Sequence, residues 1–197
     1  MEQSRSSDRS LQKQARIVEA ARHVFLQDGF RGARMERIAR EAGVAKATLY
    51  SYYPDKDAVF ATVTKHVAGE LETQFHKALG IGGKAWERIA AAVAAKHKTA
   101  RRLLQVSPHA DELYNSRPAG AAEHLQRLEA LVEREVVRLL REEGHQQPVR
   151  FAAIFLAAAE GIAAKATQPE EIGPALRLLA SHLLASPQIQ PPPSTER

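Results

Sequence analysis

Apolar residues recur at helical spacing along most of the chain. Between residues 35 and 42 they stand at i, i+3, i+4 and i+7, so they share one face of a short helix. Those positions are Met35, Ile38, Ala39 and Ala42. Similar stripes occur within 17–25, 59–75, 86–104, 125–139, 151–162 and 172–183. No segment alternates with period two over a useful length, so the pattern predicts an all-α chain of about nine helices without a sheet.

Two short helical patterns meet at Gly43. A glycine there suits the positive φ that ends many helices. In the second pattern, Leu49 and Tyr53 share a face that turns inward. The opposite side carries Ala47, Thr48, Tyr50 and Ser51, with Lys46 and Tyr52 on the flanks. Two helices joined by so short a turn form a helix-turn-helix, the motif that presents its second helix to DNA.

Three short motifs lie between residues 15 and 63. They read F-x-x-x-G-[FY], I-A-x-x-A-G-V-[ST]-x-x-x-[LI]-Y-x-[YH]-F and x-x-K-[ED]-x-L. They are met by Phe25, Gly29, Phe30, Ile38, Ala39, Ala42, Gly43, Val44, Thr48, Leu49, Tyr50, Tyr52, Tyr53, Lys56, Asp57 and Val59. This segment, the first third of the chain, resembles the DNA-binding domain of the TetR/AcrR family of bacterial transcriptional regulators.

The segment departs from the family pattern at two helix starts. Ala33 and Arg34 stand where the family usually has a Thr and a Ser or Thr that cap the first helix of the motif, and Ala45 stands where a capping Ser is common. Missing caps leave backbone donors unsatisfied, at an expected cost of about 1 kcal/mol each. We expect Arg34 to supply a phosphate contact instead.

We expect the outward side of the second helix and its flanking cations to contact DNA. The predicted DNA-binding residues are Arg34, Lys46, Ala47, Thr48, Tyr50, Ser51, Tyr52 and Lys56. Ala47 and Thr48 suit a thymine methyl group, and the Tyr50 hydroxyl suits phosphate or a base edge. The alternatives are that the two lysines are ordinary solvated side chains and that the tyrosines are packing residues.

The positive charge is concentrated in the same part of the chain. The net charge is +5, and residues 1–66 hold 12 Lys or Arg against 8 Asp or Glu. This excess agrees with a nucleic-acid footprint, although a charged helix face alone is usually only solvated. Arg5 and Arg9 lie in a polar start that is expected to be a disordered arm, with phosphate contact as the alternative.

Glycines at 80, 82 and 83 mark the clearest boundary in the chain. Beyond it every element has a helical pattern, and the proline-rich end has the composition of a disordered segment. We predict a disordered arm at 1–10, a three-helix helix-turn-helix DNA-binding domain at 11–57, a helical ligand-binding and dimerisation domain at 58–186, and a disordered tail at 187–197.

The segment 148–166 is apolar or small nearly all the way round, which a helix packed on a single core does not need. In the family that the chain resembles, the last two long helices of each subunit form a four-helix bundle across the dimer axis. The predicted interface residues are Phe151, Ala153, Ile154, Ala157, Gly161, Ala164, Leu176, Leu179 and Leu183. The alternative is a central helix of a monomeric bundle.

The resemblance also implies a small-molecule pocket among the middle helices, whose occupation releases DNA. Candidate lining residues are Trp86, His97, His109, Tyr114 and Phe155, which suit a small apolar or aromatic ligand with one polar group. The alternatives are a structural histidine and an ordinary aromatic core. Eight histidines raise the question of metal, but no HExxH spacing occurs, so we expect neither a metal nor a cofactor.

Several classes of protein are disfavoured. The chain has no GxSxG, P-loop or GxGxxG motif, so nothing nominates an enzyme. It has no cysteine, no apolar run of about 18 residues and no signal-peptide h-region, so the cytoplasm is the expected location. The expected function is a repressor that binds a palindromic operator as a homodimer. The alternatives are an activator of the same fold and a helical protein-interaction module.

Overall fold

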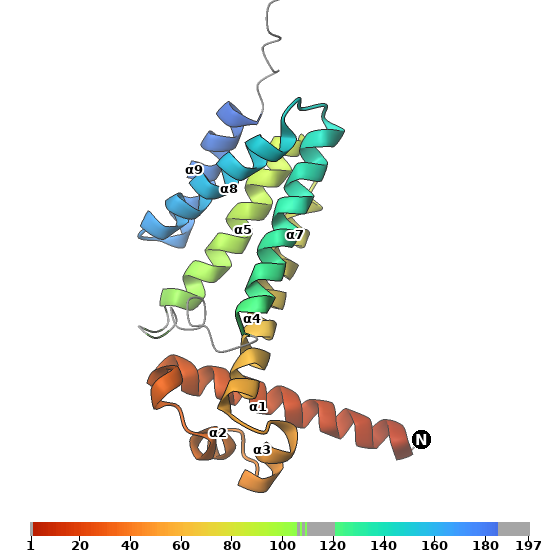
Figure 1. The fold of residues 1–197 in the computed structure, drawn as a ribbon, viewed down its shortest axis with the longest axis vertical. Helices are drawn as coiled ribbons and strands as arrows, with labels where there is room; N and C mark the ends of the chain where they lie inside the picture. The colour runs from red at the N-terminus through yellow and green to blue at the C-terminus, as the bar shows by residue number, and fades with distance from the viewer. Residues whose placement is uncertain (1, 106, 108, 110–120, 185–197) are drawn as a thin grey trace, which may run out of the picture. The chain divides into compact units, whose positions relative to one another are not determined.

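The computed structural model describes residues 2–105, 107, 109 and 121–184. Over these residues the chain forms eight α-helices and no strand, which confirms the all-α prediction. They are α1 (Glu2–Gly32), α2 (Met35–Glu41), α3 (Lys46–Tyr52), α4 (Lys56–Leu79), α5 (Ala85–Gln105), α7 (Ala121–Glu142), α8 (Pro148–Lys165) and α9 (Pro169–Leu183) (Figure 1). The sequence pattern also predicts a short helical piece from Ser107 to about Tyr114, and most of it lies outside the described residues.

The helices divide into two compact units. The first contains residues 1–72 and 100–129, and the second contains residues 73–99 and 130–197. Helices α4, α5 and α7 each contribute to both units. No helix among the described residues is long and apolar enough to cross a membrane.

In the first unit, α1 packs with α2, α3 and the start of α4 around a core in which the side chains of Phe25, Ile38, Leu49 and Phe60 are fully buried. The chain bends at Gly29, whose φ is 69°. Beyond the bend, the Phe30 ring packs 5.9 Å from Phe25 and 4.8 Å from Phe60. Helix α1 begins at Glu2, so it extends through the segment that we expected to be a disordered arm.

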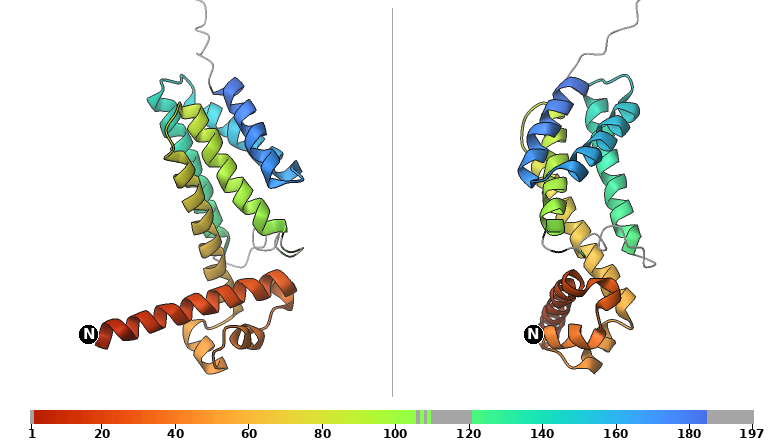
Figure 2. Two further views of the ribbon diagram at one scale, coloured as in Figure 1. Left: turned by 180° about the vertical axis from the view of Figure 1, so that it is seen from behind. Right: turned by 90° about the vertical axis from the view of Figure 1, so that its left-hand side faces the viewer.

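In the second unit, the remaining parts of α4, α5 and α7 pack with α8 and α9. The fully buried side chains include Phe75, Ile89, Leu139, Leu140, Phe155, Ile172 and Leu176. The backbone N–H of Ala85, at the start of α5, donates to Glu143 Oε1 just after α7, at 2.7 Å. Helices α8 and α9 lie side by side, as two further views show (Figure 2).

Candidate nucleic-acid interface

The turn between α2 and α3 has the geometry that the sequence predicts. Gly43 has a φ of 62°, and its N–H donates to the carbonyl oxygen of Arg40 at 3.1 Å. The Val44 N–H donates to the carbonyl oxygen of Ala39 at 3.0 Å. These bonds satisfy backbone carbonyl groups at the end of α2 and direct the chain toward α3. The two helices are therefore held as a helix-turn-helix.

Both motif helices begin without a side-chain cap. Arg34 and Ala45 occupy the N-cap positions with extended backbone (ψ 142° and 147°), and neither side chain bonds a backbone N–H of its helix. The sequence predicts this absence. Packing therefore holds the two short helices in place, chiefly through Ile38 on α2 and Leu49 on α3, which are both fully buried.

Leu49 is the one buried side chain of helix α3, and the half-buried Tyr52 packs against the same core. Its exposed residues are Lys46, Ala47, Tyr50 and Ser51, while Thr48 and Tyr52 are half-buried. Tyr50 is 42% exposed, a large value for an aromatic residue on a packed helix. The structure thus brings six of the eight predicted DNA-binding residues together on one seven-residue helix. Arg34 is exposed just before α2.

Two of the flanking residues have partners within the protein. Lys46 Nζ lies 2.6 Å from Glu36 Oε1 and 5.8 Å from the centroid of the Tyr50 ring. The Tyr52 hydroxyl lies 3.0 Å from Ser10 Oγ, which joins α3 to the N-terminal half of α1. The apolar periodicity carries no signal for either contact, because the two residues of each contact stand far apart along the chain.

Lys56 has a structural role that the sequence prediction did not include. Its ammonium donates to the carbonyl oxygens of Phe30 at 2.6 Å and Ala33 at 3.0 Å, with a longer contact to that of Arg31 at 3.4 Å. It also lies 4.6 Å from the centroid of the Phe30 ring. These contacts join the start of α4 to the end of α1. They also occupy the donors that the sequence prediction assigned to phosphate.

The predicted ligand-binding residues occupy dissimilar environments. Phe155 is fully buried in the core of the second unit, and Trp86 is half-buried on α5. Burial, with a smaller effect of the Lys96 charge, lowers the pKa of His97 from 6.5 to about 3, so this imidazole is neutral at physiological pH. His109 is half-buried, and its backbone N–H donates to Ser107 Oγ. Tyr114 lies outside the described residues.

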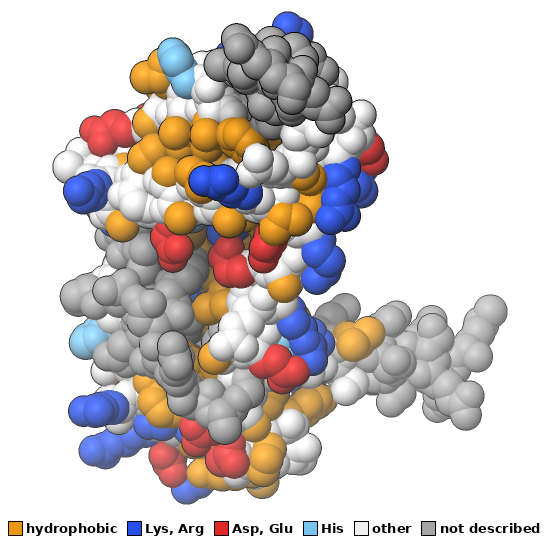
Figure 3. All heavy atoms as spheres, turned by 45° about the horizontal axis from the view of Figure 1, so that its top comes forward, with side chains coloured by type: hydrophobic (Ala, Val, Ile, Leu, Met, Phe, Trp, Pro, Cys, Tyr) orange, Lys and Arg blue, Asp and Glu red, His pale blue; other side chains and the backbone are white. Residues whose placement is uncertain are grey.

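An apolar face of α8 and α9 is exposed. Helix α8 exposes Ala153, Ile154, Ala157, Gly161 and Ala164, and Phe151, Leu179 and Leu183 are half-buried. Leu176 is fully buried within its own unit, so it belongs to the core and not to the exposed face where the sequence prediction placed it. Leu178, which the prediction omitted, is 62% exposed. Figure 3 shows hydrophobic side chains gathered over these helices.

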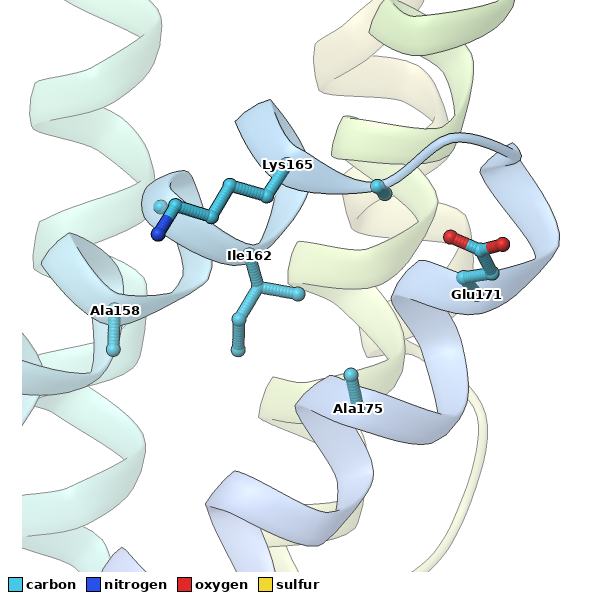
Figure 4. Close-up of a pocket in the computed structure, with 7 residues that line it drawn as sticks. Ala158, Ile162, Lys165, Glu171 and Ala175 are labelled. Atoms are coloured by element: carbon cyan, nitrogen blue, oxygen red, sulfur yellow. The ribbon is translucent and has the colours of Figure 1, made fainter.

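A shallow pocket of about 470 Å³ opens between α8 and α9 (Figure 4). It is lined by Ala158, Gly161, Ile162, Lys165, Ala166, Glu171 and Ala175. Small side chains form most of its floor, while Lys165 and Glu171 lie toward its edges. None of the predicted ligand-binding residues lines this pocket, and only Gly161 belongs to the predicted interface.

Residues 17–63 match a family model described as bacterial regulatory proteins, tetR family. The segment is a tetR-family N-terminal domain. A curated relative, the HTH-type transcriptional repressor SCO4008 of Streptomyces coelicolor, is 49% identical over 49 residues, which are 25% of this chain and 26% of the relative. The chain therefore covers about a quarter of the length of the first curated relatives that it matches.

Solved structures share the fold over a larger part of the chain. A TetR/AcrR-family transcriptional regulator from Thermobifida fusca aligns with a TM-score of 0.70 at 20% identity, over 86% of this chain and 96% of that one. The structure of AibR in complex with isovaleryl coenzyme A and operator DNA aligns with a TM-score of 0.63 at 16% identity, over 87% and 98% of the two chains. At these identities the likeness concerns the fold.

Proposed function

We propose that the chain is a sequence-specific DNA-binding transcriptional regulator, namely a repressor that binds a palindromic operator as a homodimer and is released by a small-molecule ligand. The observation that carries the proposal is α3, a helix of seven residues that buries only Leu49 and exposes Lys46, Ala47, Tyr50 and Ser51. Such a helix has one side for its own domain and one side for the major groove.

The proposed contacts follow from the exposure of each side chain. Tyr50 and Thr48 supply hydroxyl groups to phosphate or base edges, and Ala47 supplies a methyl group. The Ser51 hydroxyl donates to the Thr48 carbonyl oxygen at 2.7 Å, so we assign it to accept from a base edge. Arg34 and Lys46 are the cations that we assign to phosphate. Lys56 supports the interface indirectly, because its ammonium already joins α4 to the end of α1.

The proposed dimer uses the exposed apolar face of α8 and α9. A two-fold pair of recognition helices reads two half-sites related by the same symmetry, so the operator is proposed to be a palindrome. Repression requires only occupancy of the operator, whereas activation needs a further contact surface. The similarity to the repressor SCO4008 supports repression.

A ligand is proposed for the helical part of the chain beyond residue 57, which we assign to ligand binding and dimerisation. AibR, which shares the fold, has been solved with an acyl coenzyme A and operator DNA together. For this chain we keep a small apolar or aromatic ligand as the proposal, because Trp86 and the neutral His97 on α5 offer apolar surface and one polar group.

The test is selection of bound fragments from the source genome, followed by footprinting and a salt titration. A fixed, palindromic footprint whose affinity falls steeply with salt is the expected result. Tyr50→Ala should weaken binding to the selected fragment with unchanged helical content, while His66→Ala, an exposed change on α4, should not. A protein-interaction module would give no fixed footprint and only weak dependence on salt.

A further inference from the structure

An acidic side chain stands next to the recognition helix. Glu36, in the first turn of α2, places Oε1 2.6 Å from Nζ of Lys46, the first residue of α3. Both side chains are more than half exposed, at 57% and 58%. Exposed ion pairs contribute little to stability, and buried Ile38 and Leu49 already fix α2 and α3. The pair is therefore dispensable for the fold.

Both partners are charged at neutral pH. The hydrogen bond from Lys46 is the largest cause that lowers the pKa of Glu36, and the hydrogen bond to Glu36 is the largest cause that raises the pKa of Lys46. The Arg34 charge lowers the pKa of Glu36 further. The surface that we assign to phosphate thus holds an ionised carboxylate that contacts Lys46 and interacts with the charge of Arg34.

We infer that Glu36 competes with DNA phosphate for Lys46 and thereby lowers the affinity of the chain for all duplex DNA. This inference rests on the proposed function, because it requires α3 to dock on DNA. A phosphate that binds Lys46 must displace the carboxylate or lie close to it, and two anions brought together repel each other. The displaced carboxylate also takes a cation from solution, which offsets part of the counterion release that drives binding.

Because phosphate carries no base identity, the effect of Glu36 is on the level of affinity and not on sequence preference. A regulator has to leave the many unrelated sites of a genome, so a lower affinity for non-operator DNA reduces the time spent there. By weakening the phosphate contribution, Glu36 therefore raises the share of the binding free energy that comes from base contacts.

The experiment compares wild type, Glu36→Gln, Lys46→Gln and the double variant on two short duplexes. One duplex is selected by the wild-type chain from a random pool, and the other is unrelated DNA of the same length. The expected result is that Glu36→Gln tightens binding to both duplexes by roughly three- to tenfold and steepens the salt slope by up to about 0.9. In the Lys46→Gln background the same change should have little effect.

Glu41→Gln is the matched control. It makes the same change of charge on the same helix, where Glu41 contacts His23 at 3.0 Å and not the recognition helix. Equal changes in DNA affinity for Glu36→Gln and Glu41→Gln would mean that net charge alone explains the result, and would overturn the inference. If Glu36→Gln gave its full gain in DNA affinity in the Lys46→Gln background as well, the inference would also be overturned. Weaker DNA binding by Glu36→Gln would overturn it too, because it would mean that the carboxylate itself reads a base. If selection with the wild-type chain enriches no sequence from the random pool, the proposed function fails.

Discussion

Arg16 Nη2 donates to the carbonyl oxygen of Ala42 at 2.7 Å, so a side chain of α1 holds the end of α2. The same nitrogen lies 3.2 Å from the carbonyl oxygen of Gly43. Both carbonyls belong to the turn that sets the angle between α2 and α3. A guanidinium is suited to this position, because it remains charged and presents several donors in a fixed plane.

Replacing Arg16 by Ala should therefore loosen the turn. We expect the free energy of unfolding to fall by about 1 kcal/mol, since a charged donor to backbone carbonyls is lost from a partly exposed site. Urea unfolding followed by circular dichroism measures the change. Lys13→Ala is the control, because Lys13 is exposed on the same helix. Equal midpoints for the two variants would contradict the role given to Arg16.

Two glycines should respond to alanine with opposite signs. Gly43 has a φ of +62°, a conformation that costs an L-residue about 1 kcal/mol or more, so Gly43→Ala should destabilise the protein. Gly69 lies inside α4, where an added Cβ would have no neighbour within 4 Å apart from the helix's own backbone, so Gly69→Ala should stabilise the protein by up to about 1 kcal/mol. Thermal unfolding of the two variants measures both changes. Unfolding temperatures shifted in the same direction in both variants would refute the opposite roles given to Gly43 and Gly69.

The sequence predicted the helix-turn-helix well because each of its helices buries one face in a shared core and so carries a clear apolar stripe. The stripe through Ile38 and the inward Leu49 identified the buried faces, and Gly43 identified the turn. Contacts across the turn left no such signal. Glu36 and Lys46 are ten positions apart on two different helices, and Lys56 reaches carbonyls more than twenty residues earlier in the chain.

The exposed face of the last two helices was harder to predict for a physical reason. Helix α8 is apolar nearly all round, so its periodicity does not distinguish the side that packs on its own unit from the side that is exposed. On α9 the strongest stripe, which includes Ile172 and Leu176, faces the core. The sequence prediction assigned Leu176 of that stripe to the interface and omitted the exposed Leu178, which lies on the other side of the helix.

Stability should depend on pH through His97. Its pKa is lowered from 6.5 to about 3 in the folded protein, so the unfolded chain binds a proton that the folded chain excludes. The resulting stability is fully present above pH 6.5 and is lost as the pH falls toward 3. Urea midpoints should therefore drop between pH 7 and pH 5, and less so for His97→Leu. An equal drop in the variant would show that other groups cause it.

The oligomeric state should depend on Leu178 and not on Leu176. Leu178 is 62% exposed on the apolar face of α9, so Leu178→Glu should leave the monomer folded and place a charge in the proposed dimer interface. Leu176 is fully buried, so Leu176→Ala should cost about 2–5 kcal/mol of stability by leaving a cavity. Sedimentation velocity gives the mass of each variant, and unfolding curves give its stability. A Leu178→Glu protein that sediments as the wild type does, with unaltered DNA binding, would move the proposed interface to another surface.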